Sequence, residues 1–229
     1  MSRPIVSTLL AATMMAIAAP ATAQVSFVIQ FDGSASVLTP TERDQISSHV
    51  HEAGRRWVMA FGITAQRSIE TRIRVDATVP TANGSSETSG FVGIINGRDT
   101  FEQGAAFELR TGTDLNGATH DATITFGIDY LRNELWFDPS PITRVAAVPP
   151  SRTDAMRVAL HELGHVLLYN GWADLVTGVL PLTFSSTFDR WMVPGAPTVF
   201  VGATATRALG SAPDVTTGNN KHLGKRHAC

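Results

Sequence analysis

A chain of 229 residues is long enough for one domain with a substantial core, and 43% hydrophobic against 17% charged residues is typical of a globular protein rather than a disordered one. Lys and Arg number 18 against 20 Asp and Glu, and the formal charge of −2 excludes the basic surface of a nucleic-acid-binding protein. The single cysteine, Cys229, excludes internal disulfides.

The first 23 residues have the pattern of a secretory signal peptide. Arg3 precedes an apolar run from Ile5 to Ala19, and Ala21-Thr22-Ala23 supplies the small residues that a signal peptidase recognises. We expect cleavage after Ala23 and a mature chain that works in the periplasm or outside the cell. The apolar run is short for a membrane span and no later segment is longer, so we expect no membrane span in the mature chain.

The residues that follow predict a strand, a helix and a second strand. Val25–Phe31 alternates apolar and polar residues, as a strand with one buried face does. Thr39-Pro40, with apolar residues at helical spacing behind it, predicts a helix that ends at Gly62. Strict alternation from Ile69 to Ala77 predicts a strand with one solvated face.

The middle of the chain has weaker patterns. Residues 80–120 are rich in Gly, Ser, Thr and Asn, which predicts long loops with weak strands at Phe91–Ile95 and Ala105–Leu109. Ala122–Ile128 alternates again and predicts a further strand, and Leu135–Phe137 predicts a short one.

The best-defined element is a helix over Ala155–Leu168. Ser151 or Thr153 is a candidate cap, and Asp154 lies in the first turn, where a negative charge suits the helix dipole. Asn170-Gly171 predicts a left-handed end. Beyond it we expect only short helices or turns, around Phe184–Met192 and Ala203–Leu209.

This helix contains His161-Glu162-Leu163-Gly164-His165, an H-E-x-x-H pattern. Residues four apart lie on one helix face, so both imidazoles can reach one zinc ion at about 2.0–2.1 Å. Glu162 points away from that face and can accept a proton from a water beside the metal. The competing interpretation is a pair of hydrogen-bonded core histidines, but such groups buried unpaired in an apolar helix cost several kcal/mol.

A catalytic zinc needs a third protein ligand. One extended form of the pattern places a glycine three residues, and a histidine six residues, after the second histidine; here those positions are Leu168 and Gly171. The residues alone leave four candidates open: His222, His227, Asp189 and Asp174.

The segment Val158–Leu167 resembles the zinc helix of the leishmanolysin-like metalloproteases, a metzincin-related family, and of their bacterial secreted relatives. Phe200–Ala205 and His222-Leu223 resemble later segments of that family, so the resemblance covers about residues 120–223. It implies an exported zinc endopeptidase that cleaves proteins or peptides, with Glu162 as general base. It also implies that His222 is the third zinc ligand.

A second interpretation stays open. The family places a methionine after the third histidine, beneath the zinc, whereas this sequence has none between His222 and Cys229. A non-catalytic secreted zinc-binding relative with a shortened C-terminus would fit that departure.

The expected architecture is α+β and zincin-like: a twisted mixed sheet with a backing helix, an active-site helix and a small irregular C-terminal part. We expect residues 24–171 to form a subdomain with the zinc helix, residues 172–229 to form a second one, and the protein to be a monomer. By analogy with the family, Ala122–Ile128 is the expected edge strand that pairs with an extended substrate.

Other His and Asp residues have weaker patterns. We expect His49 and His51 on the solvated surface of the first helix. Four scattered aspartates are possible calcium ligands, although their spacing matches no known loop: Asp114, Asp121, Asp129 and Asp138.

Overall fold

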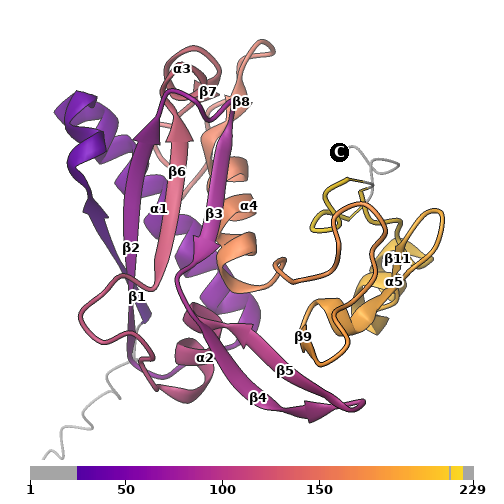
Figure 1. Cartoon of the computed structure of the whole chain (residues 1–229). Helices are drawn as coiled ribbons and strands as arrows, with labels where there is room; N and C mark the ends of the chain where they lie inside the picture. The colour runs from indigo at the N-terminus through magenta and orange to yellow at the C-terminus, as the bar shows by residue number, and fades with distance from the viewer. Residues whose placement is uncertain (1–24, 217, 224–229) are drawn as a thin grey trace, which may run out of the picture.

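The computed structural model describes residues 25–216 and 218–223, so the expected signal peptide, His227 and Cys229 lie outside the described residues. A four-stranded mixed sheet forms the centre of the larger part, with strand order β1-β2-β6-β3 (Figure 1). Its strands are β1 (Val25–Phe31), β2 (Arg67–Asp76), β6 (Ala122–Gly127) and β3 (Ala82–Ser86). The first three are parallel, and β3 runs antiparallel to β6.

Two long helices, α1 (Pro40–Phe61) and α4 (Ala155–Leu167), lie side by side on one face of this sheet (Figure 1). As predicted, Thr39 caps α1 and Gly62 ends it with a φ of 67°, a left-handed conformation that glycine adopts without steric cost. The Trp57 indole of α1 donates a hydrogen bond to the Leu160 carbonyl of α4 at 3.0 Å. The apolar faces of both helices and of the sheet form the main core.

Helix α4 begins and ends differently from the prediction. Asp154, rather than Ser151 or Thr153, is its cap and accepts a hydrogen bond from the Met156 backbone N–H at 3.0 Å. At the other end Gly171 does not have a positive φ. A Cβ atom there would lie 2.0 Å from a carboxylate oxygen of Asp189, so this glycine permits a close approach rather than a left-handed turn.

The remaining elements surround the sheet and form the C-terminal part. A second sheet has the order β4-β5-β9. In chain order these elements are η1 (Gly33–Val37), β4 (Ser89–Ile95), β5 (Arg98–Gln103), α2 (Gly104–Thr111), α3 (Ile128–Asn133), β7 (Leu135–Trp136), β8 (Thr153–Asp154), β9 (Phe184–Ser186), η2 (Asp189–Trp191), β10 (Met192–Val193), β11 (Val199–Phe200) and α5 (Ala203–Leu209). The expected α+β class is therefore confirmed. The strand predicted over Phe91–Ile95 is part of β4, and the short helix predicted around Ala203–Leu209 is α5.

Three expectations for the larger part were wrong. Ala105–Leu109 lies in helix α2, not in a strand. The strand predicted over Ala122–Ile128 stops at Gly127 and is not an edge, because β6 pairs with β2 on one side and with β3 on the other. His49 is only 1% exposed: its Nδ1 contacts the Gln45 carbonyl at 2.8 Å and its Nε2 accepts a hydrogen bond from the Asp138 N–H.

After α4 the chain builds a small second core from Ala173, Phe188, Met192 and Val215. Figure 1 shows this part beside the C-terminal end of α4, away from the long strands. None of the helices within residues 25–216 and 218–223 has the length and apolar character needed to cross a membrane.

Candidate metal centre

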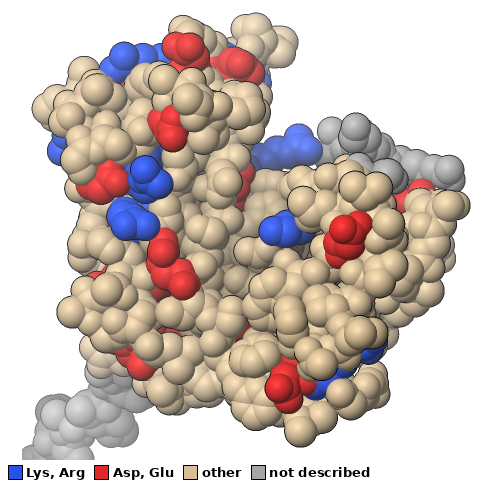
Figure 2. All heavy atoms as spheres, viewed as in Figure 1, with Lys and Arg blue, Asp and Glu red and all other residues tan. Residues whose placement is uncertain are grey.

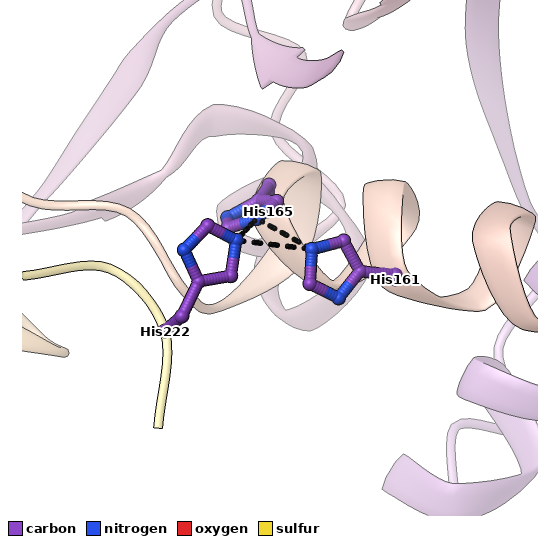
Figure 3. Close-up of side chains that lie close together, drawn as sticks. All are labelled: His161, His165 and His222. Carbon is purple, nitrogen blue, oxygen red and sulfur yellow. Dashed lines mark hydrogen bonds between the residues drawn. The ribbon is translucent and has the colours of Figure 1, made fainter. Parts of the chain in front are cut away.

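Three imidazoles, from His161, His165 and His222, converge on one point (Figure 3). The Nε2 atoms of His161 and His165 lie 3.2 Å apart, and the Nε2 atom of His222 lies 3.0 Å from the first and 2.9 Å from the second. Of the three candidate third ligands that the structure describes, it brings only His222 to the two histidines of α4. The fourth candidate, His227, lies outside the described residues.

Separate parts of the chain position these rings. His161 and His165 are four residues apart on α4 and therefore share a face. His222 lies on the last described segment, which is held by a hydrogen bond from the Thr216 N–H to the His222 carbonyl at 2.9 Å. The Asn220 side-chain amide also donates to the Asp174 carbonyl at 2.7 Å and fixes this segment to the C-terminal part.

The tautomer of His165 follows from its backbone contact. Its Nδ1 atom lies 2.9 Å from the carbonyl oxygen of Tyr169, which can only accept a hydrogen bond, so Nδ1 carries the proton. The lone pair of Nε2 then faces the other two rings. This arrangement, with one ring nitrogen donating to a carbonyl and the other free, is typical of metal-binding histidines.

The spacing fits one metal ion bound by three imidazoles. Nitrogen atoms about 2.0–2.1 Å from a tetrahedral ion are roughly 3.3 Å apart, close to the three observed separations. Imidazole nitrogens suit zinc and other late first-row metals. A single cation would satisfy three lone pairs that otherwise face one another.

The surroundings keep the three rings neutral, which is the form that binds a metal. Burial, and then the neighbouring His165 and His161 and the charge of Lys221, lower the pKa of His222 to about 4. Burial is also the main reason that the pKa of His161 and that of His165 are lowered.

Glu162 lies beside the histidine cluster and is 5% exposed. Burial raises the pKa of its carboxyl group to about 7, and a hydrogen bond from the Gly84 backbone acts in the opposite direction. A carboxylate whose pKa lies near neutrality is suited to proton transfer.

Strand β3 passes directly over this part of α4. A Cβ atom at Gly84 would lie 2.2 Å from the backbone oxygen of Glu162, so only glycine allows this approach. β3 is an edge strand of the main sheet, and it lines a cleft of about 790 Å³ together with α4 and residues 218, 219, 221 and 222. The histidines and Glu162 line the same cleft.

The other two described candidates for the third ligand have structural roles. The Asp189 carboxylate is 1% exposed and accepts hydrogen bonds from the backbone N–H groups of Trp172 and Ser186 at 2.8 and 3.0 Å. The Asp174 carboxylate accepts from the N–H of Thr177 at 2.7 Å and closes a turn. Sequence analysis missed the role of Asp189, and no pattern in the chain signals it.

A separate cluster of three acidic residues lies near the N-terminal end of β6. Carboxylate oxygens of Glu108, Asp114 and Asp121 lie within 4.8 Å of one another. Burial and the charge of Asp121 raise the pKa of Glu108 to about 8, so Glu108 is protonated at neutral pH and can donate to Asp121. A shared proton therefore explains this cluster without a cation, and calcium binding stays a prediction.

Comparisons of the chain with protein-family models, with curated proteins and with solved structures find no match. The properties of the site therefore rest on the residues and geometry described above.

Proposed function

We propose that this protein is an exported zinc-dependent endopeptidase with a zincin-like fold, in which His161, His165 and His222 hold the metal. The supporting observation is the convergence of three Nε2 atoms, within 3.2 Å of one another, in an open cleft that also contains Glu162. Zinc in such a site acts as a Lewis acid on a peptide carbonyl and increases the acidity of water.

Glu162 is the proposed general base. Its buried carboxylate would accept a proton from the attacking water and then deliver that proton to the amine that leaves. The Gly84 backbone would orient the carboxylate, since it donates a hydrogen bond to it.

The edge of β3 is the proposed docking site for the substrate. Residues 81–85 line the cleft, and β3 has only one strand partner among the described residues. An extended peptide could therefore add to the sheet as a further strand, with its carbonyl groups presented to the histidine cluster. β3 replaces Ala122–Ile128, which was expected to have this role.

Replacement of Glu162 by Gln tests the proposal. The variant should retain zinc, because it keeps all three imidazoles, but its cleavage of casein should fall by at least about 100-fold because Gln cannot accept the proton. Zinc content and cleavage rate are measured on the same preparation. Glu134→Gln, an exposed position outside the cleft, is the matched control.

Undiminished cleavage by Glu162→Gln would reject the assignment. A wild-type protein that holds one zinc per chain and cleaves no member of a broad peptide library would instead support the second interpretation, a non-catalytic zinc-binding protein. Export is tested separately, by N-terminal sequencing of the protein recovered outside the cytoplasm, where the expected first residue is Gln24.

A further inference from the structure

Two positively charged side chains line the cleft that contains the histidine cluster. Arg157 lies on α4 and Lys221 on the last described segment. Figure 2 shows the hollow between the larger part and the C-terminal part, with Lys and Arg side chains at its border. Among the described residues that line the cleft, the only acidic one is Glu162. Basic residues therefore outnumber acidic ones in this cleft, whereas the whole chain has a formal charge of −2.

Neither cation is neutralised by the fold. Within residues 25–216 and 218–223, no carboxylate pairs with Arg157 or Lys221, and neither side chain has a hydrogen-bond partner. Most of the other described arginines have structural partners, and seven of them form ion pairs: Arg55, Arg56, Arg72, Arg74, Arg110, Arg132 and Arg144. Two unpaired cations in one cleft are thus available to a ligand.

Both cations lie close to the histidine cluster, and therefore close to the place where the carbonyl of the scissile bond would bind. Arg157 precedes His161 by four residues, so it lies one helical turn, about 5–6 Å, along the same face. Lys221 is adjacent to His222 in sequence. Because an extended peptide advances by about 3.3–3.6 Å per residue, each cation can reach a substrate group within about two residues of the scissile bond.

We propose that Arg157 and Lys221 are specificity-determining residues that select peptides with a carboxylate close to the scissile bond. This inference rests on the proposed function. The carboxylate is that of an Asp or Glu side chain or of the free C-terminus of the peptide. Arg157 can bind it through two parallel hydrogen bonds and Lys221 as a point charge.

The test compares peptides that differ in one group. Matched pairs carry Glu or Gln at each of the two positions on either side of the scissile bond, and a second set ends in a free or an amidated C-terminus. Cleavage by the wild type gives kcat/KM for each, and anisotropy of the labelled peptides gives equilibrium binding to Glu162→Gln. Arg157→Gln, Lys221→Gln and Arg157→Glu are compared with Arg207→Gln, which lies on α5 outside the cleft.

We expect wild-type kcat/KM and peptide affinity to favour the acidic member by about fivefold or more, and this preference to shrink in high salt. Arg157→Gln or Lys221→Gln should reduce the preference with zinc content unchanged. Arg157→Glu should reverse the preference, so that the Gln peptide is favoured over the Glu peptide, which a purely structural role would not do. Whether the Glu/Gln pairs or the free/amidated pairs carry the preference identifies the source of the carboxylate.

Efficient cleavage without preference for either source would overturn this inference and leave the proposed function intact. Selective binding of acidic peptides, sensitive to both replacements but without cleavage by the wild type, would support the inference and count against the proposed function. Equal effects of the cleft variants and Arg207→Gln would also overturn the inference.

Discussion

Asp189 shows how one buried side chain supports the proposed metal centre from outside it. Its carboxylate binds the backbone of Trp172, just after α4, and that of Ser186, at the end of β9. It thereby fixes the chain that leaves α4 against the C-terminal part, which carries His222.

Asp189→Asn should lower the free energy of unfolding by about 2 kcal/mol, because an amide cannot replace a charged acceptor of several backbone N–H groups. Urea unfolding of the metal-free protein measures the loss. Asp174→Asn is the matched control, since an exposed Asn supports the same turn. Similar unfolding midpoints for Asp189→Asn and the wild type would show that this carboxylate does not stabilise the fold.

The residues of the site were predictable to different degrees. His161, Glu162 and His165 follow from spacing on one helix, because a helix fixes which residues share a face. His222 followed only from the family resemblance, because the residues alone also left His227, Asp189 and Asp174 open as the third ligand. The Asp189 carboxylate binds backbone N–H groups on both sides of a loop that the tertiary fold brings together, which local sequence does not encode, whereas the Asp174 carboxylate closes a local turn.

The helices and strands were also predictable to different degrees. Alternation predicted β1, β2 and β6, and helical spacing predicted α1 and α4. Strand β3, Ala82–Ser86, has no apolar alternation, and its conformation comes from pairing with β6 and packing over α4. Ala105–Leu109 is a short apolar run that suits a strand or a helix equally, and packing against α4 decides for the helix.

Gly84 determines how closely β3 approaches Glu162. In Gly84→Ala, the added methyl group would meet the Glu162 backbone oxygen and displace the strand from α4. We expect kcat/KM to fall by about tenfold or more, because small displacements of a catalytic group are costly, while zinc content is unchanged. Gly33→Ala is the control, because a Cβ atom there meets nothing within 4 Å. Full activity of Gly84→Ala would contradict the role given to this contact.

Helix α2 carries a carboxyl group that should make stability depend on pH. The pKa of Glu108 is raised from 4.5 to about 8 in the folded protein. Between these values the folded state binds a proton that the unfolded chain has released, so this group's contribution to stability falls as pH rises. Above about pH 8 both states are ionised and the loss is complete.

Glu108→Gln keeps a neutral hydrogen-bond donor beside Asp121 at every pH. Its stability relative to the wild type should therefore increase from about pH 5 to about pH 9. Urea midpoints measured with a chelator across this range test the expectation, with Glu134→Gln as the exposed control. Parallel pH profiles for Glu108→Gln and the wild type would contradict it.

At the scale of the whole molecule, the proposed metal centre joins two parts that have separate cores. His161 and His165 belong to α4 in the main core, and His222 belongs to a segment that packs with the smaller core. A ligand that binds only the folded state stabilises it by about 2.7 kcal/mol at 100 times its Kd, so zinc would act as a cross-link between the parts. The single cysteine leaves the chain no internal disulfide for that purpose.

Zinc content and zinc affinity of the wild type and of His222→Ala, measured by elemental analysis and by competition with a chelator, decide whether the three histidines act as one site. We expect one zinc per wild-type chain and an affinity at least about 100-fold lower in His222→Ala, while His227→Ala binds zinc as the wild type does. A wild-type protein that binds no zinc, or a His222→Ala protein that binds it with unchanged affinity, would contradict the proposed centre.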